Sequence, residues 1–195
     1  MRINSQNDRI SSARSACVFG SILLALFLLG ACGKSTSPET TGETRWVSAW
    51  GAATSALFPI SYNTDLVTLT NTPGINHTFR IIARPTLGGS AIRLRLSNQP
   101  GIAPIMIGSV SVGLRRSGAA VILDSSRPVT FDGAMSAVIP AGGQIISDPV
   151  LLQVSAGDDV AVSLYLPLAP TPAIHAQAFQ TNYVTESGAG DATAD

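Results

Sequence analysis

The sequence predicts an all-β protein: an antiparallel β-sandwich, jelly-roll-like, that follows a signal peptide and a flexible tether. Short runs of alternating apolar and polar residues recur at intervals of roughly 8 to 12 residues, with turn residues between them. Glycine (18 residues) and proline (12 residues) are frequent and scattered, which favours short strands joined by tight turns. No stretch after the leader has the period of a helix, which argues against a parallel βαβ domain.

Composition limits the classes of function. The 195 residues include 12 basic and 12 acidic side chains, so the net charge is zero and no field favours nucleic acid. We therefore expect no nucleic-acid partner. The length suits one ordinary domain, large enough to bury a core without disulfides or a metal ion. Both cysteines, Cys17 and Cys32, lie in the N-terminal apolar region.

The N-terminus has the pattern of a secretory leader. Arg2, Arg9 and Arg14 precede an apolar centre at residues 22–29, which is shorter than the roughly 20 residues of a spanning helix. Small residues stand just before Cys32, as in the lipobox of bacterial lipoproteins. We expect residues 1–31 to be a lipoprotein signal peptide and Cys32 to carry the lipid. A plain secretory signal or a signal anchor, with Cys32 incidental, is the alternative.

Residues 32–44 are small and polar, which predicts a flexible tether between the lipid and the domain. The protein would then be exported and attached to the cell envelope through its N-terminal lipid. Gly33 rather than Asp follows the cysteine. By resemblance to known sorting, this favours the outer membrane in a diderm bacterium.

The predicted sandwich spans residues 45–187 and begins with Trp46 and Trp50, four residues apart. On a strand the two rings share a face, so they form either a buried aromatic pair or a platform on which a sugar stacks. Further strands are predicted in the order Phe79–Arg84, Ala91–Asn98, Ile105–Arg116, Ala119–Leu123, Val129–Phe131, Ala137–Ile139 and Ile174–Val184. The tail, residues 188–195, is predicted to be disordered.

The strongest strand signal is the hairpin at residues 147–167. Val160, Val162, Leu164 and Leu166 alternate with Ala161, Ser163 and Tyr165, so the four aliphatic side chains share one buried face. The break at residues 156–159 suits a chain reversal, since glycine tolerates positive φ and Asp side chains bond nearby amides.

Catalytic motifs are not evident. The chain contains no Gly-x-Ser-x-Gly element, and neither His77 nor His175 has an evident serine partner. Both histidines are predicted to be partly exposed strand residues, with His175 a further candidate ligand contact. Asp148, Asp158 and Asp159 lie beside turns, where capping explains them better than paired acid–base work. Asp124, Asp132 and Asp148 could bind a calcium ion from loops, but their spacing does not resemble an EF-hand loop. We expect no catalytic residue, no metal and no cofactor.

An ordered set of short blocks resembles the N-terminal non-catalytic domain of a group of bacterial SGNH (GDSL-type) hydrolases. The blocks are Trp46-Val47-Ser48-Ala49-Trp50-Gly51-Ala52-Ala53, Thr78-Phe79-Arg80, Gly88-Gly89, Arg93-Leu94-Arg95-Leu96-Ser97-Asn98, Val129-Thr130-Phe131-Asp132-Gly133, Ile139-Pro140-Ala141-Gly142, Ser147-Asp148-Pro149-Val150, Val162-Ser163-Leu164-Tyr165-Leu166-Pro167, His175 and Gln180-Thr181-Asn182-Tyr183. In that family an α/β domain follows and carries the serine of a Gly-Asp-Ser block and a distant Asp-x-x-His pair. Here Gly190-Asp191 is followed by Ala192, and no residue matches the nucleophile.

The resemblance implies a truncated or partial form of such an esterase, inactive alone. Two other hypotheses remain open: a stand-alone lipoprotein that binds carbohydrate or another surface ligand, and a module that docks on a separate SGNH catalytic chain.

Overall fold

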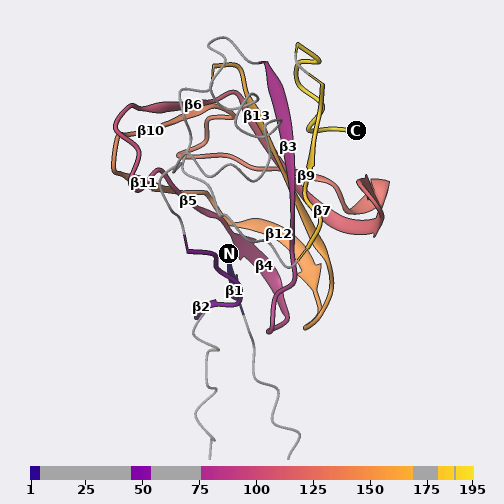
Figure 1. The fold of residues 1–195 in the computed structure, drawn as a ribbon. Helices are drawn as coiled ribbons and strands as arrows, with labels where there is room; N and C mark the ends of the chain where they lie inside the picture. The colour runs from indigo at the N-terminus through magenta and orange to yellow at the C-terminus, as the bar shows by residue number, and fades with distance from the viewer. Residues whose placement is uncertain (5–44, 54–75, 169–179, 187) are drawn as a thin grey trace, which may run out of the picture.

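The computed structural model describes residues 1–4, 45–53, 76–168, 180–186 and 188–195 (Figure 1). Cys32, the tether at 32–44, His175 and the leader beyond Asn4 lie outside the described residues. Within those residues the regular structure consists of antiparallel strands and one 3-10 turn, η1 (Leu123–Ser125). The prediction of an all-β antiparallel sandwich is confirmed. The described residues include no helix long and apolar enough to cross a membrane.

One layer is a six-stranded sheet centred on the second strand of the predicted hairpin. Its strands are β14 (Tyr183–Val184), β3 (His77–Ala83), β13 (Val160–Leu166), β7 (Ser109–Ser117) and β8 (Ala120–Val121) in that order, with β9 (Arg127–Pro128) also paired to β7. All seven residues of β13 pair with β3 in register, from Val160 opposite Ala83 to Leu166 opposite His77. On its other side β13 pairs with β7 without a register shift.

The alternation in β13 places its aliphatic residues as predicted, but both of its faces are covered. Val160, Val162, Leu164 and Leu166 are buried in the core between the sheets. Ser163 on the opposite face is also buried, at 1% exposure. The alternation therefore predicts which face of β13 packs in the core, but it does not predict that the other face is covered as well.

The second layer is a four-stranded sheet that uses the start of the chain. Its order is β12 (Val150–Val154), β4 (Gly89–Arg93), β1 (Arg2–Asn4) and β2 (Trp46–Ser48). Ile3 in β1 lies opposite Val47 on one side and Ile92 on the other, and its side chain is fully buried. A chain cleaved before Cys32, as the sequence predicts, would lose β1.

Two shorter pairs complete the sandwich: β10 (Ala137–Ile139) with β6 (Ile105–Ile107), and β11 (Gln144–Ile146) with β5 (Arg95–Ser97). Two predicted strands are therefore each divided between sheets. The division at Leu94 separates β4 from β5, and the backbone there bonds to Ser147. The division at Gly108 separates β6 from β7, and Gly108 donates to the Tyr165 carbonyl at 2.9 Å.

The division at Gly108 changes which side chains of this segment are buried. Continuous alternation through this segment would bury Met106 together with Val110 and Val112. Met106 is instead 47% exposed, whereas Ile105 and Ile107 are buried. The chain leaves its partner β10 and joins β13 at this glycine, so the alternation restarts.

The C-terminal segment, defined as residues 188–195, also departs from prediction. Composition predicts disorder, but the segment is ordered against the outer face of the six-stranded sheet, beside β3 (Figure 1). Thr193 is buried at 8% exposure. The segment has few apolar side chains to bury, and hydrogen bonds hold it against the sheet instead.

Candidate functional site

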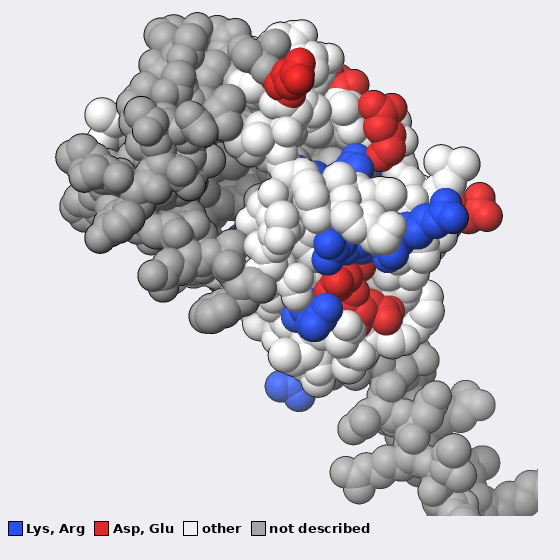
Figure 2. All heavy atoms as spheres, turned by 45° about the vertical axis from the view of Figure 1, so that its right-hand side comes forward, with Lys and Arg blue, Asp and Glu red and all other residues white. Residues whose placement is uncertain are grey.

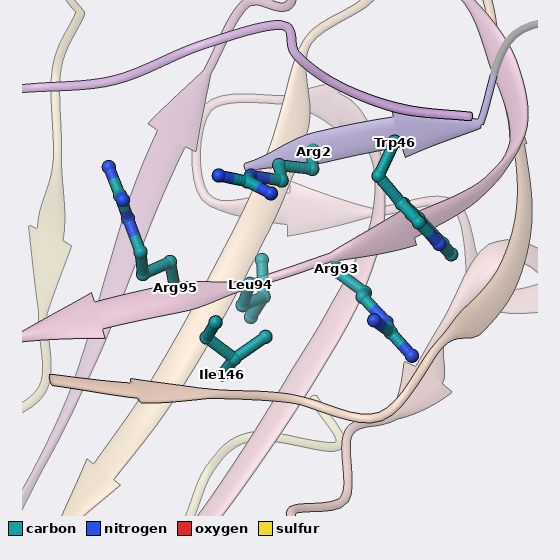
Figure 3. Close-up of a pocket in the computed structure, with 6 residues that line it drawn as sticks. All are labelled: Arg2, Trp46, Arg93, Leu94, Arg95 and Ile146. Carbon is teal, nitrogen blue, oxygen red and sulfur yellow. The ribbon is translucent and has the colours of Figure 1, made fainter.

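The first candidate site is a small cleft around Trp46, one of the predicted ligand contacts. It has a volume of about 60 Å³ and is lined by Arg2, Trp46, Arg93, Leu94, Arg95 and Ile146 (Figure 3). In Figure 3, Leu94 and Ile146 lie between Arg95 on one side and the Trp46–Arg93 pair on the other. We call this group the arginine cleft. Its lining residues come from β1, β2, the β4–β5 junction and β11.

The charged side chains that line the arginine cleft are all positive. The Arg93 guanidinium stacks over the Trp46 ring, 4.8 Å from its centroid, a cation–π contact that fixes its plane. No described residue forms an ion pair or a side-chain hydrogen bond with Arg2, Arg93 or Arg95. Arg93 Nε is buried and has no hydrogen-bond partner. The cleft thus presents guanidinium donors with no carboxylate in its lining.

The N-terminal ammonium adds to the positive charge nearby. Met1 N donates to the Trp50 carbonyl at 3.0 Å. Its pKa is lowered, first by burial and then by the positive charges of Arg95 and Arg2. These cations therefore repel one another, and a bound anion would relieve the repulsion.

The two tryptophans do not form one platform in the cleft. Trp50 lies beyond the end of β2 and is partly buried against the hydrophobic core. Trp46 alone lines the cleft. The third predicted contact, His175, lies outside the described residues.

His77 is fully buried, which corrects the expectation of a partly exposed strand residue. Its Nδ1 lies 2.8 Å from the Thr185 carbonyl oxygen, and because a carbonyl only accepts, Nδ1 is the donor. Its Nε2 is buried without a partner, and the ring contacts Phe79 edge-on. The ring is held by the C-terminal part of the chain, and no described serine hydroxyl bonds to it.

Asp148 and Asp159 have structural partners. Asp148 accepts from the Thr130 hydroxyl at 2.6 Å and from the Gly133 amide at 2.8 Å. These bonds hold the pKa of Asp148 below its usual value. Asp159 pairs with Arg84 at 2.8 Å and with Arg115 at 3.2 Å. The described residues contain no group of three acidic, His or Cys side chains placed to hold a metal ion.

The second candidate site is the polar outer face of the six-stranded sheet, which the sequence analysis missed. Arg80 in β3 is its centre: its Nε donates to the Ser163 hydroxyl at 2.8 Å and its Nη1 to the Ala119 carbonyl at 2.6 Å. Its Nη2 donates to the carbonyls of Ala192 and Asp195, at 3.3 and 2.7 Å. One guanidinium thus joins β3, β13 and the C-terminal segment.

Three hydroxyls on the same face complete this contact. Ser109 donates to Asp191 Oδ2 at 2.6 Å, and the Thr193 amide and hydroxyl donate to Asp191 Oδ1 at 3.0 and 2.7 Å. Ser111 donates to the Thr193 carbonyl. Thr78 donates to the Gly190 carbonyl at 2.9 Å. We call this set of contacts the C-terminal clamp.

The clamp also sets the ionisation of Asp191. Burial acts to raise the pKa of this carboxyl, but the hydrogen bonds from Ser109 and Thr193 outweigh burial, and the pKa is lowered overall. Acidic and basic side chains lie next to one another on this side of the molecule (Figure 2). The face is therefore not a single-sign surface. The sequence signal that could have revealed this face is the alternation of small and polar residues in β7 and β13.

Comparison with known proteins adds no assignment. No protein-family model matches the chain, and a search of curated proteins finds no match. The resemblance to SGNH hydrolases therefore stays a prediction that depends on the quoted blocks.

Proposed function

We propose that the chain is an exported, non-catalytic β-sandwich module that acts as an accessory domain of an SGNH-type esterase. The observation that carries the proposal is the C-terminal clamp. In the family that the chain resembles, the catalytic domain follows this part of the sequence. A segment fixed by Arg80, Ser109 and Thr78 would hold whatever follows it in one orientation on the sheet.

The chemistry of the described residues supports a module that does not act alone. An acyl-transfer enzyme needs a nucleophile, a base in hydrogen-bond reach and an oxyanion site. The buried His77 bonds to a backbone carbonyl, and Asp191 holds the tail. No described hydroxyl bonds to His77, and the two hydroxyls that bond to Asp191, those of Ser109 and Thr193, are both buried.

The experiment starts with the DNA that follows the codon for Asp195. If it encodes a Gly-Asp-Ser block in frame, the longer protein should hydrolyse p-nitrophenyl acetate, and residues 1–195 alone should not. Arg80→Ala should then reduce hydrolysis by the longer protein through a loosened clamp, while Arg116→Ala, on an exposed residue outside the clamp, should not. If it encodes none, purified residues 1–195 should bind a separately expressed SGNH domain from the same genome. Failure of both routes would refute the accessory role.

A second candidate function is the binding of a surface carbohydrate by a lipid-anchored module. One contact favours it: the Arg93 guanidinium stacks over the Trp46 ring, and these two residues, which both follow the predicted leader, form an aromatic and cationic surface. The lipid anchor itself rests on Cys32 and the leader, and mass spectrometry of the mature N-terminus tests it. A diacylglyceryl cysteine at position 32 is the expected result.

A further inference from the structure

We propose that one end of the sandwich is an apolar wedge that enters the interfacial layer of a lipid membrane with anionic headgroups. The wedge is defined as residues 98–106 and 138–143: the loop between β5 and β6, the loop between β10 and β11, and the adjoining residues of β6 and β10. In Figure 1 the pairs β6–β10 and β5–β11 lie at the left, one above the other, whereas β7 and β9 lie at the right. The proposal goes beyond the accessory role and does not depend on it.

The wedge exposes large apolar side chains and no charged ones. Ile102, in the loop between β5 and β6, is 98% exposed, and the cross-strand partners Met106 and Val138 are 47% and 52% exposed. Neither residues 96–114 nor residues 133–147 include an Asp, Glu, Lys or Arg. An exposed apolar surface without charged neighbours is typical of an interaction site, because its contact with water is unfavourable.

The backbone of the wedge is suited to an apolar medium. Buried Asn98 ties the two loops together, since its Nδ2 donates to the carbonyls of Ala103 and Pro140, at 2.8 and 3.0 Å. The Gly142 amide donates to the Gly101 carbonyl at 2.7 Å. Lipid offers few partners for a backbone donor, so internal hydrogen bonds and residues without an N–H favour entry. The wedge has three such residues: Pro100, Pro104 and Pro140.

The shape of this end favours lipid over a protein partner. Ile105 in β6 is buried and Ile145 in β11 packs against the core. The next residues along each strand, Met106 and Ile146, therefore point outward, and Ile146 is 53% exposed. Apolar side chains thus lie on the outer faces of both strand pairs, and Ile102 lies in the loop that joins the pairs. A flat protein surface covers one face, whereas a lipid layer surrounds an inserted end.

Arg95 supplies a charge that complements anionic headgroups. It is exposed on β5, has no ion-pair partner among the described residues, and lies roughly 10 Å behind Asn98 along the strand. An apolar surface at a membrane interface enters it by roughly 5–10 Å. Arg95 would therefore lie at the level of the headgroups, where a cation is attracted to anionic lipid. If Cys32 carries the predicted lipid, the tether keeps the domain near the membrane and a weak contact suffices.

The test places a fluorophore on the wedge of the full chain. Ile102→Cys, in a chain that also carries Cys17→Ser and Cys32→Ser, is labelled with the environment-sensitive dye NBD. Vesicles of phosphatidylcholine with phosphatidylglycerol should shift its emission to the blue and raise it several-fold, and vesicles of phosphatidylcholine alone should have a smaller effect. The apolar leader can bind vesicles in every variant alike, so the readout is the position of the emission change and not the bound fraction.

The matched control for position is Leu123→Cys with the same dye. Leu123 is 78% exposed and lies in η1, outside the wedge, so its emission should not change. The charge is tested by Arg95→Gln in the chain labelled at position 102, which should lower the ratio of inserted to free dye roughly fivefold. Arg116→Gln, at an exposed position outside the wedge, should leave this ratio unchanged. Circular dichroism checks that each variant is folded.

Each outcome supports or overturns the proposal. A response at position 102 with none at position 123 supports it. No response at position 102, equal responses at both positions, or a response that ignores phosphatidylglycerol would overturn it, as would equal losses in Arg95→Gln and Arg116→Gln. A response that rises with protein concentration without vesicles would assign the wedge to a second copy of the chain and overturn the proposal as well. None of these results bears on the accessory role, which the esterase experiment tests separately.

Discussion

The two sheets of the sandwich depend on different parts of the chain. The six-stranded sheet is built from residues 77–184, and its central strand β13 pairs along its whole length with β3. The four-stranded sheet places β1, a three-residue strand that begins at Arg2, between β4 and β2. One layer is therefore independent of the predicted leader, whereas the other depends on it. The comparison indicates which layer should survive processing.

The largest effect should come from a charge in the centre of the six-stranded sheet. Val160 is fully buried between Ala83 and Leu114, so Val160→Asp places a carboxyl in an apolar core without a partner. We expect a loss of about 4 kcal/mol or more, which is enough to unfold many domains. Urea unfolding followed by circular dichroism measures it. Ile3→Asp should cost less, because β1 can detach; an equal loss would show that the two layers unfold as one.

The next prediction tests β1 directly through Gly89. A Cβ at Gly89 would lie 2.1 Å from the Asn4 carbonyl oxygen and 2.1 Å from Ile3 Cγ2. Gly89→Ala should therefore destabilise the full chain by about 2 kcal/mol, as overpacking does. In a chain that begins at Arg45 the same change should have almost no effect. The difference between the two unfolding free energies is the measurement.

Gly51→Ala is the matched control, since a Cβ there meets no atom within 4 Å. It should leave both chains unchanged. If Gly89→Ala destabilises the short chain as much as the full one, then the loss of stability does not come from a clash with β1.

A smaller effect is expected at the C-terminal clamp, which belongs to the self-contained layer. Asp191→Asn should cost about 1 kcal/mol, because the amide keeps the shape of the carboxylate and loses its charge. The loss should be local, seen as faster hydrogen exchange of residues 190–193 with an unchanged core. Glu186→Gln, on an exposed side chain, serves as the control and should leave exchange unchanged. Global acceleration would contradict a local clamp.

The smallest effect concerns pH and the ion pairs of Asp159. The pKa of Asp159 is lowered chiefly by the hydrogen bond from Arg84. The charges of Arg84 and Arg115 lower it further, whereas burial acts to raise it. A carboxyl with a lowered folded-state pKa stabilises the fold above its unfolded value near 4, and this contribution is lost as the pH falls through the folded pKa. Since Arg84 is 56% exposed, solvent screens the pair and we expect less than about 1 kcal/mol.

The measurement for Asp159 is the unfolding free energy of the parent and of Asp159→Asn at pH 7 and pH 3. The parent should lose more stability than the variant on acidification. Identical pH dependence would mean that Asp159 does not contribute to it.

The sequence predicts the parts of the fold that local pattern determines. Alternation in Val160 to Leu166 identified the core face, and the turn at Gly157, with φ of +87°, follows from glycine's tolerance of that conformation. The positions where a strand changes sheets, Leu94 and Gly108, depend on partners far along the chain and leave no local signal.

The candidate sites were predictable only in part. Trp46 was identified as a ligand contact from its residue type, and it lines the arginine cleft. Arg93 was assigned no contact of its own from the sequence, and in the structure it stacks on Trp46, because β1 and β2 bring the ring to it. The C-terminal clamp depends on Arg80 meeting residues more than a hundred positions away, which composition cannot reveal.

The central claim is that this chain alone is a module without an activated nucleophile. Labelling of the purified, folded chain with a fluorophosphonate probe tests it most directly, since such probes react with serines activated by a neighbouring base. We expect no labelling above that of the heat-denatured chain. Stoichiometric labelling of the folded chain, abolished by one Ser→Ala substitution, would contradict it.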